Sequence, residues 1–163
     1  MMRWLILTAL WLASSVYAQE FRSPDGKLVA LVQAVGVKKF GRGESCIEIR
    51  SSMGLVKSRT CYQSDDGEHG AGLERAAWTP DSQFFVYSTS SSGGHQPWAF
   101  PTYFYSALDD RTRLLDDFVG PITEPEFSVM VPDVVSTVTW GSVTARKEER
   151  HVTNLRSLVR ERK

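Results

Sequence analysis

The apolar positions of this chain recur at the short spacing of β-strands over most of its length. Alternating or β-branched runs are separated by turn residues, and the helical spacing of apolar residues is almost absent before residue 145. We predict strands at residues 27–34, 45–50, 55–62, 73–79, 83–89, 102–108, 113–116, 126–131 and 134–143. The pattern therefore predicts an all-β fold.

Two stretches of the sequence repeat the same phrase. FRSPDGKLVAL begins at Phe21 and AAWTPDSQFFVYS begins at Ala76, and each leads through a Pro-Asp turn into a hydrophobic strand. Proline pre-sets the backbone of such a turn, and aspartate bonds to the backbone two residues further on. We interpret the phrase as an internal repeat with units at about residues 21–62 and 73–117. After its hydrophobic strand, each unit has a longer loop, a strand, a tight turn and a last strand.

These turns resemble a known repeat. The residues that carry the resemblance are Ser23, Pro24, Asp25 and Gly26 in the first unit and Trp78, Thr79, Pro80 and Asp81 in the second. They are similar to the WD40-like Pro-Asp repeat of TolB-type β-propellers, in which this phrase joins the first two strands of each blade. The second unit departs from the family at Ser82, where the pattern has glycine.

The resemblance implies two blade-like antiparallel sheets. A closed propeller needs about four to eight blades, so two units cannot close a ring. The sheets would then form a partial propeller or a small sandwich, or be completed by self-association. We expect one compact β-domain over residues 19–143, with residues 118–143 and a C-terminal amphipathic helix over residues 144–163 covering its exposed parts.

The two cysteines of the chain, Cys46 and Cys61, lie on predicted strands on either side of a tight turn. A two-residue loop at residues 53–54 places Cys46 opposite Cys61 and Glu48 opposite Arg59, which also pairs opposite charges. An even number of cysteines in an exported protein favours a disulfide. We therefore predict that Cys46 and Cys61 form one.

The same register contains one unfavourable pair. It sets Arg50 opposite Lys57, and like charges directly opposite one another destabilise a sheet unless that face is solvated. The disulfide would close a loop of about 15 residues, which the chain-entropy model values at about 3 kcal/mol. The sequence contains no CxxC motif, so we interpret the two cysteines as a structural link rather than a redox centre.

Residues 1–18 have the composition of a secretory signal peptide. Arg3 gives a positive start, residues 4–13 are apolar, and small residues precede a cut before Gln19. An apolar run of this length is shorter than the roughly 20 residues that span a bilayer, although an uncleaved anchor is the alternative. The residue directly after the cut is not cysteine, which disfavours a bacterial lipoprotein. We predict an exported protein, periplasmic or secreted.

The C-terminal segment differs in kind from the rest of the chain. It is rich in Lys and Arg, and Val152, Leu155, Leu158 and Val159 recur at helical spacing. This pattern predicts a basic amphipathic helix. Such a helix either docks on the sheets or contacts a membrane surface or a partner.

Candidate binding chemistry gathers in the loop after the strand at residues 83–89. The candidate ligand- or partner-binding residues are His95, Gln96, Trp98 and Phe100, followed on the next strand by Tyr103 and Tyr105. Tryptophan offers a flat apolar platform, and His and Gln fix the orientation of a ligand. The alternative is that the aromatic rings pack in the core.

A second cluster offers oxygen ligands. Asp65, Asp66 and Glu68 suit Ca²⁺, but they lack the spacing of an EF-hand loop. A solvated acidic turn is the alternative interpretation. We expect no cofactor, because the remaining sequence gives no other ligand pattern.

The charge balance and the absence of familiar catalytic motifs limit the classes of function that the sequence allows. Lys and Arg together equal Asp and Glu at 19 each, so no overall field attracts nucleic acid. HExxH, GxSxG, a P-loop and a GxGxxG after a strand are absent from the sequence. We expect a non-catalytic β-module of the cell envelope that acts by small-ligand binding or protein–protein contact, with another envelope protein or a second copy as partner. The alternatives are a periplasmic hydrolase-like enzyme using His95 and a peripheral membrane protein held by residues 145–163.

Overall fold

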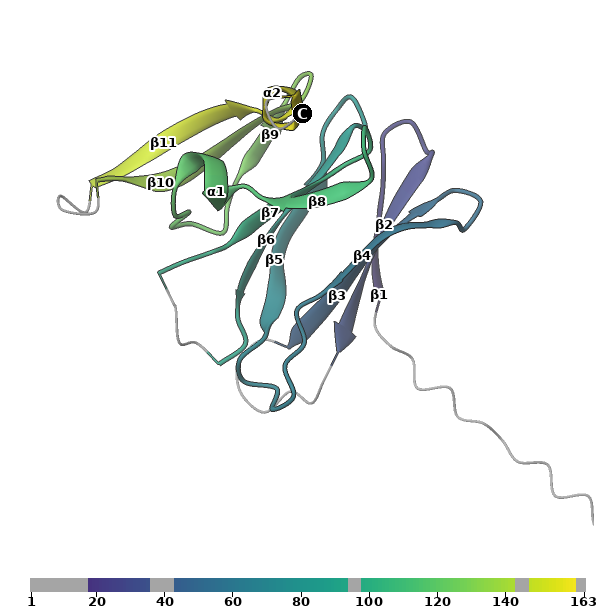
Figure 1. The fold of residues 1–163 in the computed structure, drawn as a ribbon, viewed down its shortest axis with the longest axis horizontal. Helices are drawn as coiled ribbons and strands as arrows, with labels where there is room; N and C mark the ends of the chain where they lie inside the picture. The colour runs from purple at the N-terminus through teal and green to yellow at the C-terminus, as the bar shows by residue number, and fades with distance from the viewer. Residues whose placement is uncertain (1–17, 36–42, 94–97, 143–146, 161–163) are drawn as a thin grey trace, which may run out of the picture.

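The computed structural model describes residues 18–35, 43–93, 98–142 and 147–160 (Figure 1). The strands are β1 (Ala18–Arg22), β2 (Leu28–Val35), β3 (Glu44–Ser51), β4 (Val56–Cys61), β5 (Ala71–Trp78), β6 (Phe84–Ser91), β7 (Thr102–Ser106), β8 (Arg111–Leu114), β9 (Ser128–Met130), β10 (Val134–Ser142) and β11 (Lys147–Asn154). The helices are α1 (Asp116–Val119) and α2 (Leu155–Arg160). Within the described ranges, neither helix is long and apolar enough to cross a membrane.

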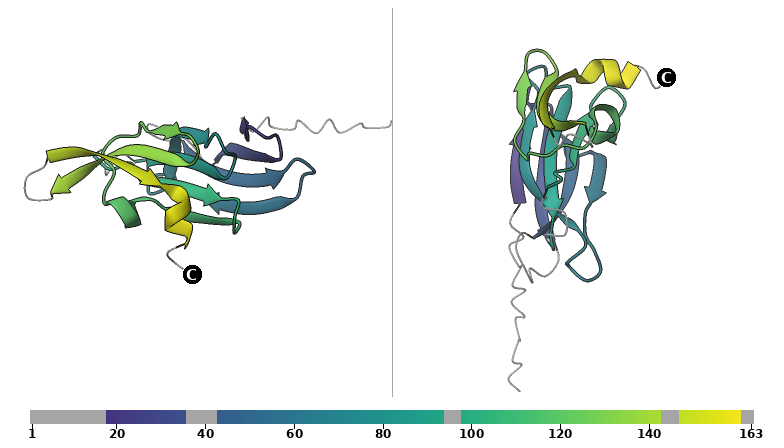
Figure 2. Two further views of the ribbon diagram at one scale, coloured as in Figure 1. Left: turned by 90° about the horizontal axis from the view of Figure 1, so that it is seen from above. Right: turned by 90° about the vertical axis from the view of Figure 1, so that its left-hand side faces the viewer.

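Within the part of the chain that the structure describes, the strands form three antiparallel sheets, which confirms the predicted all-β class. Sheet A has the order β1-β2-β3-β4, sheet B has the order β5-β6-β7-β8, and sheet C has the order β11-β10-β9. Each sheet is built from strands that follow one another in the chain, as the repeat predicted for sheets A and B. The three sheets lie side by side, with sheet B in the middle (Figures 1 and 2).

Sheet B separates two hydrophobic clusters. Between sheets A and B lie the buried residues Ala30, Val32, Ile47, Ile49, Trp78, Phe85, Tyr87 and Tyr105. On the other side of sheet B lie Phe84, Val86, Phe104, Leu115, Ile122, Phe127, Val135, Leu155, Leu158 and Val159. Successive side chains of a strand point to opposite faces, so β6 contributes to both clusters. A strand covered on both faces carries a continuous apolar run, which is the sequence FFVY.

The two Pro-Asp turns make the same hydrogen bonds. In each turn the hydroxyl of the first residue donates to the aspartate and accepts the backbone N–H that begins the next strand. The bonds join Ser23 to Asp25 (2.7 Å) and Leu28 (3.0 Å), and Thr79 to Asp81 (2.7 Å) and Phe84 (3.1 Å). The two turns are therefore structurally equivalent.

Ser82 takes the conformation that glycine takes in the first turn. Its φ is 62° and that of Gly26 is 72°, in the left-handed region that costs a non-glycine residue about 1–2 kcal/mol. The Ser82 hydroxyl accepts the backbone N–H of Asp25 at 3.0 Å. The departure from glycine therefore adds a hydrogen bond between the turns of sheets A and B.

A third Pro-Asp turn joins β9 to β10. The carbonyl of Pro132 accepts the backbone N–H of Asp81 at 3.3 Å. Arg156 donates to Asp81 (2.8 Å) and to the buried carboxylate of Asp133 (2.9 Å). The sequence interpretation counted two units and missed this one, because Val131 stands where the other turns have a hydroxyl residue.

The hairpin of β3 and β4 confirms most of the predicted register. Cys46 and Cys61 form a disulfide, and Glu48 pairs with Arg59. The predicted pairing of Arg50 with Lys57 is wrong, because the register shifts after Ile49 and Arg50 pairs with Val56. The irregularity removes the opposition of like charges, and Lys57 instead donates to Asp110 at 3.2 Å.

The C-terminal segment is helical over a shorter range than predicted. Lys147–Asn154 forms β11, which pairs with β10 along its length, and the helix begins only at Leu155. Val152, predicted on the helix, lies on β11 and is 63% exposed. Leu158 and Val159 are buried in the cluster shared with sheet B. The strand forms because hydrogen bonds to the neighbouring β10 outweigh the helical spacing of only four apolar residues.

Candidate functional site

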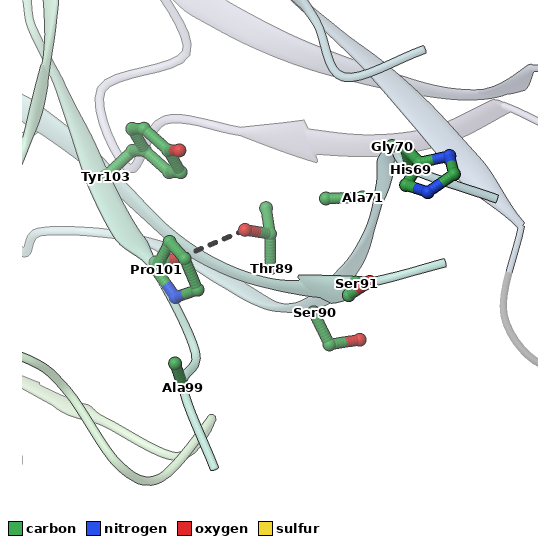
Figure 3. A pocket seen from close by; sticks show the side chains of 9 residues that line it. All are labelled: His69, Gly70, Ala71, Thr89, Ser90, Ser91, Ala99, Pro101 and Tyr103. Carbon is green, nitrogen blue, oxygen red and sulfur yellow. Dashed lines mark hydrogen bonds between the residues drawn. The ribbon is translucent and has the colours of Figure 1, made fainter. Parts of the chain in front are cut away.

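The end of sheets A and B opposite the Pro-Asp turns contains a pocket, here called the loop-end pocket. Its main cavity has a volume of about 250 Å³ (Figure 3). The lining residues are His69, Gly70, Ala71, Thr89, Ser90, Ser91, Ala99, Pro101 and Tyr103. A second cavity of about 230 Å³ is lined by Tyr62, Gln63, His69, Gly70 and Ala71. The two cavities share residues 69–71 and so adjoin on the β4–β5 loop.

A buried carboxylate holds this loop in place. Glu44, at the start of β3, is 2% exposed. It accepts the backbone N–H groups of Ser64 (2.9 Å) and Gly70 (3.0 Å), and the hydroxyls of Ser64 and Ser92 (3.1 Å for Ser92). Burial by itself raises the pKa of Glu44, but these donors outweigh burial and hold the pKa below its usual value. Glu44 therefore stays ionised and ties the β4–β5 loop and Ser92, which follows β6, to the start of β3.

Gly70 can pass this carboxylate only because it has no side chain. A Cβ at this position would lie 2.3 Å from a Glu44 carboxylate oxygen and 2.3 Å from the Tyr62 carbonyl oxygen. The backbone here is also engaged: Ala71 N–H donates to Tyr62 at 2.8 Å, and Ser92 N–H donates to Gly70 at 2.9 Å. The loop is thus fixed by backbone contacts on both sides of Gly70.

One wall of the pocket is aromatic: Tyr103 lines the main cavity, Tyr62 lines the second, and the buried Tyr87 packs behind them. The Tyr87 and Tyr103 rings stack with centroids 5.4 Å apart, and the Tyr62 ring lies 5.0 Å from that of Tyr103. The Tyr62 and Tyr87 hydroxyls are 2.9 Å apart. Burial raises the pKa of all three phenols, and the neighbouring Tyr87 adds to the rise at Tyr62. The wall is therefore uncharged.

Two hydroxyl residues of β6, Thr89 and Ser90, are among the lining residues, and their side chains point to opposite sides of the strand (Figure 3). Thr89 donates its hydroxyl to the Pro101 carbonyl at 3.1 Å, as the dashed line in Figure 3 shows. Ser90 donates to the Glu74 carboxylate. A hydroxyl that donates its proton keeps two acceptor lone pairs. Thr89, whose side chain lies on the side of Tyr103, therefore acts toward a ligand as an acceptor.

The predicted acidic cluster is organised as a turn. Asp66 accepts the backbone N–H groups of Glu68 (2.9 Å) and His69 (3.2 Å), and its other oxygen pairs with the His69 ring. The Glu68 backbone bond and the His69 ring lower the pKa of Asp66. Within the described ranges, Asp65, Asp66 and Glu68 are not part of a group that could hold a metal ion. The turn instead presents His69 to the pocket.

The predicted binding residues are dispersed. His95 and Gln96 lie outside the described residues. Trp98 is 58% exposed, and the backbone of Phe100 donates to Ile122 at 3.0 Å. Tyr105 is fully buried and donates its hydroxyl to Asp110 at 2.5 Å. Of the described candidates, the structure brings Tyr103 alone into the loop-end pocket.

Sequence reasoning missed the other residues of the site. Glu44 begins a strand and lies far along the chain from its partners at residues 64, 70 and 92, and no local motif marks it. His69 directly follows the predicted acidic cluster, and no feature of the sequence indicates that it lines a pocket. The serine run at residues 90–92 was the one available signal, because consecutive hydroxyls at a strand end often serve hydrogen bonding.

Comparison with known proteins adds information on the fold alone. The sequence matches no family model and no curated protein. A solved structure from Clostridium novyi NT, a protein provisionally described as a conserved lipoprotein, is similar in fold with a TM-score of 0.50. The two share 12% identity over 85% of this chain and 86% of that chain. At that identity the likeness supports a common β architecture.

Proposed function

We propose that this protein is an exported, non-catalytic β-module of the cell envelope that binds a small ligand in the loop-end pocket. The observation that carries the proposal is a pocket on a loop that the buried Glu44 fixes to its neighbours. Ligand sites are usually preformed concave surfaces with a few placed polar groups. Loops held by a rigid sheet are also common positions for binding residues.

Three further observations support export to the envelope. Residues 1–18 have the composition that predicts a signal peptide. The Cys46–Cys61 disulfide suits an oxidising compartment. The similar structure from Clostridium novyi NT is described as a lipoprotein. We also interpret the three sheets as a partial propeller of the WD40-like Pro-Asp type, on the strength of the two equivalent turns.

The alternatives have less support. Contact with a membrane through residues 145–163 would have to rely on basic side chains, because Leu155, Leu158 and Val159 are buried in the core. A hydrolase needs a nucleophile beside a positioned base and an oxyanion hole. The described pocket hydroxyls of Thr89 and Ser90 donate instead to a carbonyl and a carboxylate.

The test is a fragment screen followed by nuclear magnetic resonance. A mixed panel of neutral, anionic, cationic and apolar fragments is added to the ¹⁵N-labelled protein, and amide shifts are mapped. We expect saturable shifts at residues 69–71, 89–91 and 103. Ala71→Leu fills both cavities and should abolish the amide shifts. Ala34→Leu, on an exposed strand end, should leave the shifts unchanged. Shifts that cluster elsewhere, or none from any fragment class, would overturn the proposal.

A further inference from the structure

We propose that the ligand of the loop-end pocket is a neutral sugar. This inference rests on the proposed function and specifies it further. Its first support is the charge of the lining: among the described residues that line the two cavities, none is Lys, Arg, Asp or Glu, and the ring of the one histidine, His69, is paired with Asp66. An ionic ligand would lose its hydration without gaining an opposite charge. The site therefore favours an uncharged ligand.

The hydroxyl pattern points to a ligand rich in donors. Thr89 already donates its proton within the protein, so it offers lone pairs to a ligand. The raised pKa of Tyr103 keeps its phenol protonated in the same wall. Sugar hydroxyls both donate and accept, so one ligand type satisfies both kinds of partner. A purely apolar ligand would leave these groups without hydrogen bonds, which costs about 1–3 kcal/mol for each buried group.

An extended peptide fits the site less well. Peptides that add to a sheet edge are held chiefly by free backbone groups of that edge. Here the Gly70 N–H donates to Glu44, the Gly70 carbonyl accepts from Ser92, and the Ala71 N–H donates to Tyr62. The edge at the pocket is thus already used within the protein. A ligand must therefore bind through side chains, and a compact molecule with several hydroxyl groups can do so.

The size of the pocket suggests two sugar units. The cavities have volumes of about 250 Å³ and about 230 Å³, and both include residues 69–71. Each is smaller than the roughly 300 Å³ at which sites for drug-sized ligands begin. Two small cavities of nearly equal volume on either side of one loop match a ligand made of two similar rings. We infer a disaccharide, or the end of a longer neutral glycan.

The test is a titration of the purified protein with maltose, cellobiose and N,N′-diacetylchitobiose, followed by amide shifts. We expect at least one to give saturable shifts at Ala71, Ser91 and Tyr103. Ser91→Glu places a carboxylate in the lining and should weaken the binding at least tenfold. Ser52→Glu is the matched control on an exposed hairpin at the other end of sheet A, and it should bind as the wild type does.

The outcomes distinguish the inference that the ligand is a sugar from the proposal that the pocket binds a ligand. If the sugars give no shifts while fragments of another class shift the same residues, the sugar inference is overturned and the proposed function stands. If no probe of any class reaches these residues, both fail. If a sugar binds equally well to the wild type and to Ser91→Glu, the site is elsewhere and the inference is also overturned. Loss of sugar binding in Ser91→Glu, together with unchanged sugar binding in Ser52→Glu, supports the inference.

Discussion

The two ends of sheets A and B are built in different ways. At the turn end, defined by residues 23–28 and 79–84, the same hydrogen bonds recur in two sheets and span five residues or fewer. At the loop end, Glu44 gathers donors that lie 20, 26 and 48 residues away. The hydrogen bonds within each turn are local and repeated, and bonds such as that from Asp25 to Ser82 then join the turns. The loop end instead depends on one set of long-range bonds around Glu44.

This difference separates scaffold from site. A repeated local turn can be formed in each unit without help from the others, and it sets how the sheets stack. A single buried carboxylate that joins the β4–β5 loop to Ser92 shapes one particular surface, and that surface holds the pocket.

The largest expected effect comes from Gly70→Ala at the loop end. The added methyl group meets the Tyr62 carbonyl oxygen and the Glu44 carboxylate, so the loop must shift and the buried charge loses a partner. We predict a loss of about 4 kcal/mol in the free energy of unfolding, measured by urea denaturation. Gly54→Ala is the matched control, because a Cβ there meets nothing within 4 Å and only its φ of 86° is strained; it should cost about 1 kcal/mol. Equal costs for the two variants would refute the contrast between the ends.

The next effect comes from the disulfide, which joins β3 to β4 at the loop end. Removing it in a Cys46→Ala, Cys61→Ala double variant should cost about 3 kcal/mol, because its loop of roughly 15 residues is then free in the unfolded chain. The melting temperature of the wild type, measured with and without reductant, tests the same stabilisation. An unchanged melting temperature under reductant would show that the link does not stabilise the fold.

Glu44 should give the loop end a dependence on pH. Its pKa is lowered in the folded protein, so its contribution to stability is complete above the unfolded-state pKa and is lost as the pH falls through the folded-state pKa. Glu44→Gln cannot accept all four hydrogen bonds and should cost about 2 kcal/mol at neutral pH. As the pH is lowered from 7, the melting temperature of the variant should fall less than that of the wild type. Parallel curves for the two proteins would contradict this role of Glu44.

The smallest effects belong to the turn end and test its repetition. Ser23→Ala and Thr79→Val each remove a hydroxyl that makes the same two bonds, so each should cost about 1 kcal/mol. Because the turns are equivalent, the two costs should agree within about 0.5 kcal/mol. Urea denaturation of both variants provides the comparison. A large cost at one turn and none at the other would show that the hydrogen-bond sets are not equivalent in energy.

Sequence reasoning succeeded where structure is local. The strand pattern, the Pro-Asp turns and the pairing of Cys46 with Cys61 follow from neighbouring residues and a tight turn, and all are present. The short strand β1 was read only as a lead-in, because AQEFR has little alternation and depends on pairing with β2. The third turn escaped notice because Val131 lacks the hydroxyl of the other two.

The candidate site was harder to predict for the same physical reason. Tyr103 could be named from its aromatic surroundings, but Glu44 has its partners far along the chain. Gly70 could not be recognised, because only the folded backbone shows that a Cβ would strike Tyr62. Tyr105 was predicted as a candidate for binding, yet the alternation of β7 directs it into the core between sheets A and B.

The account rests on the claim that Glu44 holds the loop end independently of the turn end. The most direct measurement compares the amide shifts of the wild type and of Glu44→Gln under conditions in which both are folded. We predict large changes at Ser64, Gly70 and Ser92, with the amides of Leu28 and Phe84 unchanged. Changes spread evenly over both ends, or none at Ser64 and Gly70, would contradict the claim.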